Sequence, residues 1–361
     1  MSKLLDQVSK ETQAGQYGGF KIKSMAGYTP ERIQWLWPDM IAKGILHVFA
    51  GDSGIGKTML LCDISAIVSR GGIFPGQKER CEAGKVVYLS GEDGLNHTIG
   101  PRLEAAGADM EQMLELPPLN NQGKLFDLST DVDFITDHLL DIGGVSLFII
   151  DPVTAFCGGR FDNDSVTSVR SITLKLGALA ESTGIAIIAL QHLTKSSQST
   201  MKYRILGSGA WVQGPRIVLG GLVTSDDHRL FGKVKANITD TNGVYPFSIE
   251  RYELRDIGDV RRIEWGEECW FDNQLSEFEG EFELSNSKGQ LVYDILKESL
   301  SDGEWRSRDF LIKKILTVVE VHDSTVARMA EELGIEKRRT KEVPPRTEWC
   351  IPKPFISVHK E

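Results

Sequence analysis

The sequence predicts an α/β protein with a mostly parallel sheet flanked by helices, followed by a small C-terminal helix-turn-helix or winged-helix unit. Two observations predict the sheet. Short, continuously apolar segments alternate with helical patterns over the first two thirds of the chain, and such runs are typical of strands covered on both faces. A glycine-rich segment joins the first of these strands to a long helical pattern. Strands joined by crossover helices build an α/β fold.

The predicted elements follow one another in the order that a parallel sheet requires. Residues 1–30 are polar and contain glycines, so we expect a lead-in segment there. Apolar runs then predict the strands, and residues at helical spacing predict the helices between them. The predicted strands are 45–50, 85–90, 144–150, 185–190 and 216–222, and the predicted helices are 57–70, 97–106, 130–141 and 165–183.

The pattern changes after residue 223. Alternating and aromatic-rich segments up to about residue 280 predict antiparallel strands that extend the sheet. The acidic, turn-rich stretch LSEFEGEFELSNSKG is a predicted linker, and helical periodicity follows it. We therefore expect a large α/β domain over residues 31–280 and a separate unit over residues 287–361.

Composition narrows the class of protein. The length of 361 residues allows one large domain with an appendage, or two domains. The formal net charge of −10 argues against a wholly basic surface that coats nucleic acid, so any contact with a polyanion must be local. The five cysteines are scattered without C-x-x-C pairs, so neither a zinc site nor a disulfide framework is predicted. No membrane span or secretory signal is evident, and we expect a soluble, cytoplasmic protein.

Residues 51–58 read GDSGIGKT, which fits the pattern G-x-x-x-x-G-K-[ST] between a predicted strand and a predicted helix. Glycines let backbone N–H groups approach phosphate oxygens, and the helix N-terminus favours negative charge. Lys57 is expected to contact the β- and γ-phosphates and Thr58 to hold Mg²⁺. The predicted ATP-binding residues are Gly51, Asp52, Ser53, Gly54, Ile55, Gly56, Lys57 and Thr58.

Acidic residues follow two other predicted strands. Asp151 comes directly after LFII and is a candidate ligand for the metal. The next residue is Pro152, so the Asp-Glu pair that many ring ATPases carry on this strand is missing. Glu92 and Asp93 lie in YLSGEDG, where Glu92 is the candidate catalytic base and Asp93 its neighbour or a helper of the metal. The alternative is that Gly-Glu-Asp-Gly is only a polar turn.

A further predicted strand ends with Gln191 and His192. A polar side chain at this position could touch the γ-phosphate and report its presence to neighbouring loops, and His192 is the candidate sensor. The alternative is a histidine that only satisfies its own packing.

Together these strand ends resemble the RecA-type ATPase core, and more narrowly the plasmid RepA hexameric helicase family with its phage and plasmid relatives. The resemblance covers roughly residues 33–240. The matching stretches are WLWPDMIAKGILHVFAGDSGIGKTML, VVYLSGED with PRLEAAGAD, LFIIDPVTAF with FDNDSVTSVR, and IIALQHLTK with ILGSGAWVQGPRIVL.

This resemblance implies an ATP-driven ring, usually of six subunits, that encircles single-stranded DNA and translocates along it. It also implies that a basic residue of the next subunit completes each site. Arg216 is the first candidate for that residue and Lys235 the second. Related helicases of the DnaB type carry Lys-x-Arg where this chain has Lys235-Ala236-Asn237, which favours Arg216. The site residues that the resemblance carries over are Lys57, Thr58, Glu92, Asp93, Asp151 and His192.

Two segments, 157–165 and 194–208, correspond to the loops that face the central pore in RecA-like rings. The second carries Lys195, Lys202 and Arg204, with Tyr203 as a candidate stacking platform. Positive charge and an aromatic ring suit sequence-independent binding of single-stranded DNA. The alternative is a solvated loop without a ligand.

The C-terminal unit resembles a helix-turn-helix. Asp323 would cap one helix, Gly334 would make the turn, and a second helix beginning at Ile335 would expose the basic residues Lys337, Arg338 and Arg339. The stretch TEWCIPKP would form a wing. DNA contact and docking of a protein partner both remain open for this unit.

Three functions follow from these observations. The first is a DNA-dependent ATPase that acts as a hexameric replicative helicase of a plasmid or phage. The second is a recombination ATPase that forms filaments on single-stranded DNA, and the third is a nucleotide-switched regulatory DNA-binding protein. No primase-like segment is present, so an initiator or primase would be a separate partner.

Overall fold

The computed structural model describes residues 25, 27–51, 54–159, 161–193, 201, 205, 209–224, 228–278, 288–318, 323–340 and 347–351. Backbone contacts divide the chain into two parts, Met1–Gln34 and Trp35–Glu361. The division into residues 1–30, 31–280 and 287–361 stays a prediction.

A mostly parallel sheet of ten strands forms the centre of the α/β region, as predicted. Its order is β11-β10-β9-β8-β3-β7-β6-β4-β5, and β12 pairs with β10. All five predicted parallel strands are present, and the short β5 is an addition. The parallel strands are β3 (Leu46–Gly51), β4 (Lys85–Ser90), β5 (Met113–Glu115), β6 (Val145–Asp151), β7 (Ala186–His192) and β8 (Ile217–Val223). The antiparallel strands are β9 (Arg229–Ala236), β10 (Asn242–Leu254), β11 (Gly258–Trp265) and β12 (Trp270–Gln274).

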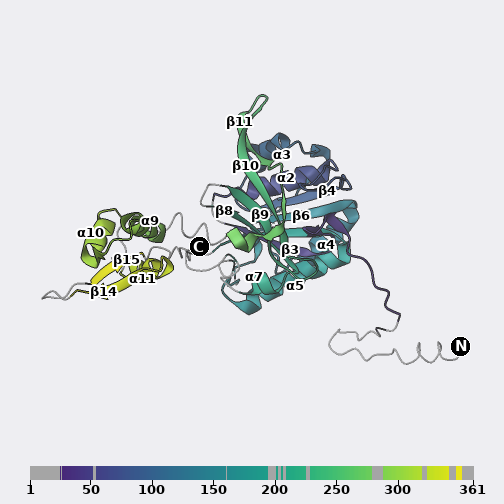
Figure 1. Ribbon diagram of the computed structural model, residues 1–361. Coiled ribbons are helices and arrows are strands. Elements are labelled where there is room, and N and C mark those ends of the chain that lie inside the picture. The colour runs from purple at the N-terminus through teal and green to yellow at the C-terminus, as the bar shows by residue number, and fades with distance from the viewer. Residues whose placement is uncertain are drawn as a thin grey trace, which may run out of the picture. The chain divides into compact units, whose positions relative to one another are not determined.

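Helices cover both faces of this sheet (Figure 1). On one face, α2 (Lys57–Ser69) and α3 (Gly100–Ala105) bury their apolar residues against the strands. On the other face lie α4 (Val132–Ile142), α5 (Val166–Thr183) and α7 (Ala210–Gln213). The predicted helix 97–106 is divided, because a π-helix over Leu95–Ile99 precedes α3.

Strand register brings the predicted site residues to one edge of the sheet. The chain leaves β3 through α2 on one face and returns to β7 and β8 through α5 and α7 on the other. Ligands of open α/β sheets bind at the carboxyl edge where the connections change face in this way. Gly51 is the register partner of His192, and Ser90 is the partner of Asp151. The ends of four strands therefore face one site.

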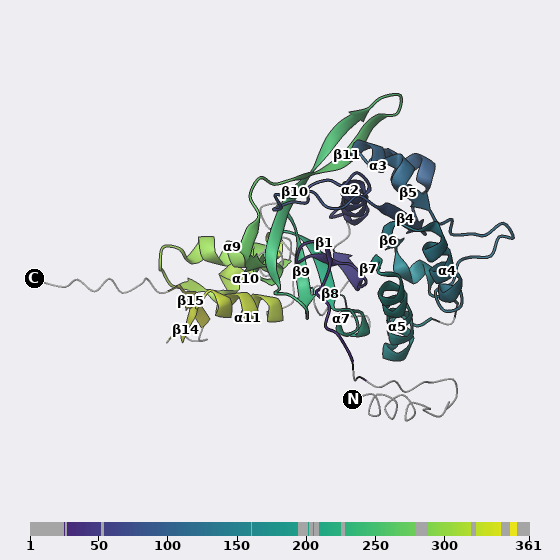
Figure 2. The same cartoon turned by 90° about the vertical axis from the view of Figure 1, so that its right-hand side faces the viewer.

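Strands β10 and β11 form a long hairpin that projects beyond the sheet beside α3 (Figure 2). At its base, the Trp265 indole N–H donates to Asp63 Oδ2 on α2 at 2.7 Å. Burial raises the pKa of Asp63 to about 6, although this hydrogen bond acts in the opposite direction. The hairpin is thus fixed to the helix that follows the glycine-rich loop.

A buried histidine joins three strands. The hairpin of β1 (Trp35–Trp37) and β2 (Ile41–Ala42) packs beside β3. The Ala42 N–H donates to His47 Nε2 at 3.0 Å, so the proton lies on Nδ1, which is 3.1 Å from the Ile187 carbonyl oxygen. Burial lowers the pKa of His47 to about 4. The imidazole is therefore neutral in the folded protein at neutral pH.

The C-terminal unit has the element order of a winged helix. Its three-stranded sheet has the order β13-β15-β14, and it has an apolar core of its own that includes Leu296, Leu311, Met329 and Trp349. The elements are α9 (Lys288–Leu300), β13 (Arg306–Ser307), α10 (Arg308–Val318), α11 (Asp323–Glu332), β14 (Glu336–Arg339) and β15 (Thr347–Cys350).

The predicted second helix beginning at Ile335 is wrong. Gly334 adopts a φ of 62° and ends α11, and the next residues form strand β14. As a strand, these residues pair with β15 along their whole length, from Glu336 beside Cys350 to Arg339 beside Thr347. The helix pair is therefore α10 and α11, and Lys337, Arg338 and Arg339 lie exposed on a strand.

None of the helices in the described part of the chain has both the length and the apolar character that a membrane span requires.

We expect His47→Gln to flatten the pH dependence of stability below neutrality. The folded protein keeps His47 neutral while the unfolded chain binds a proton at its ordinary pKa of 6.5. Stability from this histidine is complete above pH 6.5 and is lost as the pH falls toward 4, by about 3 kcal/mol. Urea denaturation at several pH values between 7 and 4 measures this difference.

Asp63 titrates in the same range with the opposite sign, since its raised pKa makes the folded state gain stability as the pH falls. That contribution is common to parent and variant and cancels in their difference. Equal slopes of unfolding free energy against pH in the two proteins would contradict the assignment of His47.

Candidate nucleotide site

The glycine-rich loop runs from the end of β3 to the start of α2. Gly54 and Gly56 adopt φ values of 82° and 100°, which side chains other than glycine rarely tolerate. A Cβ at Gly51 would lie 2.7 Å from the Gly221 carbonyl oxygen, so this position also has no room for a side chain. The Ile55 side chain is buried and anchors the loop on the sheet. Asp52 and Ser53 lie outside the described residues.

Lys57 begins α2 and is almost fully buried. Its ammonium group donates to the Gly51 carbonyl oxygen at 2.9 Å, which folds the side chain back over the loop. An ammonium group forms stronger hydrogen bonds with a phosphate oxygen than with a neutral carbonyl. The loop, its lysine and the N-terminus of α2 therefore fit the phosphates of a nucleotide.

Asp151 lies at the end of β6 and is only 4% exposed. Its carboxylate accepts hydrogen bonds from the hydroxyl groups of Thr58 and Tyr88, the latter at 3.0 Å. Burial raises the pKa of Asp151, the two hydrogen bonds lower it, and the negative charges of Asp93 and Glu92 raise it. A cation bound here would relieve this crowding of carboxylates.

The pair Thr58 and Asp151 fits a Mg²⁺ ion that also binds phosphate. Mg²⁺ in such sites takes one or two protein carboxylates and completes its shell with phosphate oxygens and water. The described residues contain no group of three or more His, Cys, Asp or Glu side chains that could hold a metal. Thr58 and Asp151 would thus hold Mg²⁺ together with a nucleotide.

Glu92 and His192 face one another across the carboxyl edge. Their Oε1 and Nε2 atoms lie 3.5 Å apart, and their side chains are 64% and 48% exposed. The two residues come from different strand ends, since Glu92 follows β4 and His192 ends β7. A carboxylate in contact with solvent and oriented by an imidazole suits a base that activates water.

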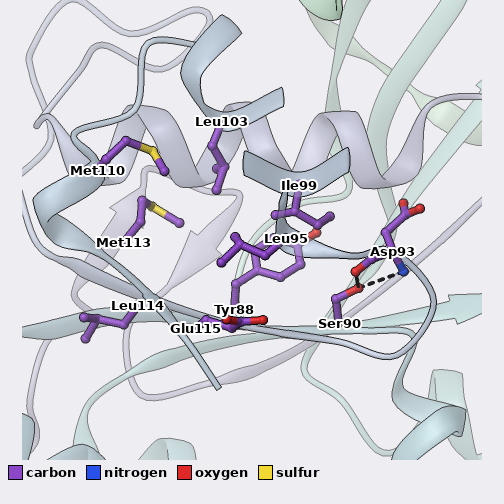
Figure 3. A pocket seen from close by; sticks show the side chains of 10 residues that line it. All are labelled: Tyr88, Ser90, Asp93, Leu95, Ile99, Leu103, Met110, Met113, Leu114 and Glu115. Carbon is purple, nitrogen blue, oxygen red and sulfur yellow. Dashed lines mark hydrogen bonds between the residues drawn. The ribbon is translucent and has the colours of Figure 1, made fainter. Parts of the chain in front are cut away.

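Asp93 has a different environment from its neighbour. Its Oδ2 accepts from Arg102 of α3 at 3.1 Å. The turn is fixed by Ser90, whose hydroxyl donates to the Asp93 carbonyl oxygen at 2.7 Å and accepts from the Asp93 N–H at 3.1 Å (Figure 3). This geometry favours Glu92 over Asp93 for contact with the reacting groups, and the role of Asp93 at the metal stays a prediction.

Sequence reasoning missed an apolar pocket beside this turn. Figure 3 shows it between β4, β5 and the helices that follow β4, and its volume is about 90 Å³. Ser90 and Asp93 lie at its polar end. The apolar residues that line it are Leu95, Ile99, Leu103, Met110, Met113 and Leu114.

Gln191 has different contacts from His192. Its side chain is buried and its amide donates to Asn163 Oδ1 at 3.3 Å, while the Trp211 indole N–H donates to the same oxygen at 2.8 Å. Gln191 Oε1 is buried without a partner. Asn163 and Trp211 were not predicted as contacts of this strand, although both lie in stretches that carry the family resemblance. His192 thus contacts Glu92 whereas Gln191 contacts Asn163, and the role of His192 as a sensor stays a prediction.

Arg216 and Lys235 lie at the opposite edge of the sheet. Since β8 runs parallel to β3 with Ile217 beside His47, Arg216 is exposed near the start of β3, away from the loop at its end. The ammonium group of Lys235 donates within the same chain to the carbonyl oxygens of Val212, Gln213 and Pro215, at 2.7, 3.2 and 2.8 Å. These hydrogen bonds hold the ammonium group of Lys235 at the end of α7 of its own chain. Arg216 therefore remains the candidate for action on a neighbouring subunit.

The predicted DNA-binding residues are only partly described. Lys195, Lys202, Tyr203 and Arg204 lie outside the described residues. In the C-terminal unit Arg338 donates to Glu348 Oε2 at 2.9 Å and lies over the Trp305 ring at 4.2 Å. Lys337 and Arg339 are exposed on the same strand.

Comparison with known proteins agrees with this geometry. Residues 19–198 match a family described as AAA domain, and this segment includes the glycine-rich loop, Glu92, Asp151 and His192. Over these residues the chain matches a family of P-loop ATPases, and its sheet has the mostly parallel order of a RecA-like α/β fold.

The chain is also similar to DNA repair proteins RadA of several bacteria. It is 25% identical over 254 residues to that of Listeria monocytogenes, which covers 66% of this chain and 46% of the relative. It is 27% identical over 157 residues to that of Bacillus subtilis, covering 43% of this chain and 29% of the relative. For Streptococcus pneumoniae RadA the identity is 28% over 155 residues, covering 43% and 31%. This chain therefore spans less than half the length of these relatives.

The different environments of the two neighbouring acidic residues give a test. We expect Glu92→Gln to reduce ATP turnover about 100-fold or more, because the base is lost while the shape of the loop changes little. Asp93→Asn, the matched control, should retain most turnover, since that carboxylate is held by Arg102. The effect is measured as the rate of single-turnover ATP hydrolysis, under conditions where the parent and both variants bind nucleotide equally. Rapid hydrolysis by the Glu92→Gln protein would show that Glu92 is not the base.

Proposed function

We propose that this protein hydrolyses ATP and couples hydrolysis to movement along DNA, as a ring-forming replicative helicase of a plasmid or phage. The observation that supports hydrolysis is the convergence of Lys57, Thr58, Asp151, and the Glu92–His192 pair at one sheet edge. The helicase assignment rests on the resemblance of the strand-end motifs to the RepA-type family.

In the proposed reaction, water attacks the γ-phosphate in line with the leaving group, and Glu92 accepts the proton from that water. Lys57 stabilises negative charge on the phosphates. Mg²⁺, when bound by Thr58 and Asp151, would supply further charge neutralisation. His192 would orient Glu92 and would respond to loss of the γ-phosphate.

Two surfaces are proposed for DNA. Lys195, Lys202 and Arg204 belong to a segment that would neutralise the phosphates of a single strand in the pore, with Tyr203 stacking on bases. Lys337, Arg338 and Arg339 are exposed on β14 and would support a second, peripheral contact. Arg216 would act in trans at the site of the next subunit of a hexameric ring.

A second candidate function is a recombination or repair ATPase that assembles on single-stranded DNA. The similarity to the DNA repair proteins RadA favours it, since the aligned region in Listeria monocytogenes covers 66% of this chain. A third candidate, a nucleotide-switched regulator of DNA binding, is supported only by the winged-helix order of the C-terminal unit.

ATP turnover with and without single-stranded DNA separates these functions. We expect stimulation by single-stranded DNA, and loss of turnover in Lys57→Ala with an unchanged circular dichroism spectrum, because the variant removes phosphate contacts and leaves the core intact. ATP turnover that does not change when DNA is added would favour the regulatory protein over the helicase and the recombination ATPase.

Strand displacement then separates a helicase from a filament-forming ATPase. We expect ATP-dependent separation of forked duplexes that carry a 5′ or 3′ single-stranded tail, with one tail preferred because a ring moves in one direction. Electron microscopy with single-stranded DNA should show closed rings. If filaments form and neither substrate is separated, the result would favour the recombination ATPase over the helicase.

A further inference from the structure

Tyr88 lies next to the proposed metal ligand without being part of the P-loop. It belongs to β4, which runs parallel to β6 with Tyr88 beside Ile149 and Ser90 beside Asp151. Because side chains two residues apart point to the same face of a strand, Tyr88 and Ser90 share one face. The phenol is 4% exposed, and its hydroxyl reaches Asp151 Oδ2 at 3.0 Å.

The hydroxyl of Tyr88 donates to Asp151 on one side, and the buried thiol of Cys62 lies close to it on the other. Cys62 lies in α2, the helix that begins with Lys57 and Thr58. A carboxylate can only accept in such a contact, so the phenol is the donor and Asp151 the acceptor.

This contact restricts how the carboxylate can turn. A buried carboxylate that accepts a hydrogen bond on Oδ2 loses rotational freedom, because turning away would break that bond. Thr58, which also hydrogen-bonds this carboxylate, is the other proposed ligand of the metal. We propose that Tyr88 is a positioning residue that orients Asp151 toward Thr58 for Mg²⁺, an inference that rests on the proposed ATP site.

Tyr88 also fills the core between the sheet and α2, where it belongs to the same apolar cluster as Leu60, Ile64 and Leu103. Replacement by phenylalanine keeps the ring and removes only the hydroxyl. Tyr245 provides a matched control, because its phenol is 3% exposed in the same cluster but on β10. Tyr245→Phe removes a buried hydroxyl that has no contact with Asp151.

The experiment measures binding of a fluorescent ADP analogue to the full chain as MgCl₂ is increased from an EDTA-treated start, and the Mg²⁺ dependence of ATP turnover. We expect Tyr88→Phe to raise the Mg²⁺ concentration for half-maximal binding about tenfold, as is typical when a residue that orients a metal ligand is lost. Binding in EDTA should match the parent, and Tyr245→Phe should match it throughout.

A double variant shows whether the effect passes through Asp151. In an Asp151→Asn background, Tyr88→Phe should cause no further change in the Mg²⁺ dependence. Equal Mg²⁺ dependence of the Tyr88→Phe and Tyr245→Phe proteins, or an additional loss in the Asp151→Asn background, would overturn the proposal. Failure of the parent itself to bind the analogue would instead overturn the proposed ATP site, and with it this inference.

Discussion

The candidate site depends on the parallel register of four neighbouring strands. β3, β7, β6 and β4 end at the same edge, so the loop after β3, His192, Asp151 and Glu92 meet without any long-range adjustment of the backbone. Each strand is apolar because it is covered by helices on both faces, and the polar groups appear only where the cover ends. The strand ends therefore determine where the candidate site lies, and the loops supply its remaining groups.

The charged groups at this edge of the sheet differ strongly in their exposure to solvent. Asp151 is buried beside hydroxyl donors, whereas Glu92 lies in solvent opposite an imidazole. The neighbouring Asp93 is held by a guanidinium group from α3. Three carboxylates from two adjacent strands thus have three environments. That of Asp151 suits a cation, that of Glu92 suits proton transfer, and Asp93 is paired with α3.

Much of this arrangement could be predicted from the sequence, because apolar runs and the GDSGIGKT pattern carry strong local signals. The strands, the loop and the acidic residue after LFII were all found in this way. The contacts of Tyr88, Asn163 and Lys235 could not be predicted, since they join residues distant in sequence through side-chain geometry. Residues 336–339 were predicted as helical from local pattern, but pairing with β15 decides their conformation.

Close packing between β8 and the glycine-rich loop has a mechanical consequence. Gly221 lies against Gly51 and Ile55 so tightly that no methyl group fits between them. The same strand begins immediately after the exposed Arg216, at the far edge. One continuous strand therefore runs from the exposed Arg216 to the glycine pair beneath the loop, and the close packing there leaves little room for β8 to shift without displacing the loop.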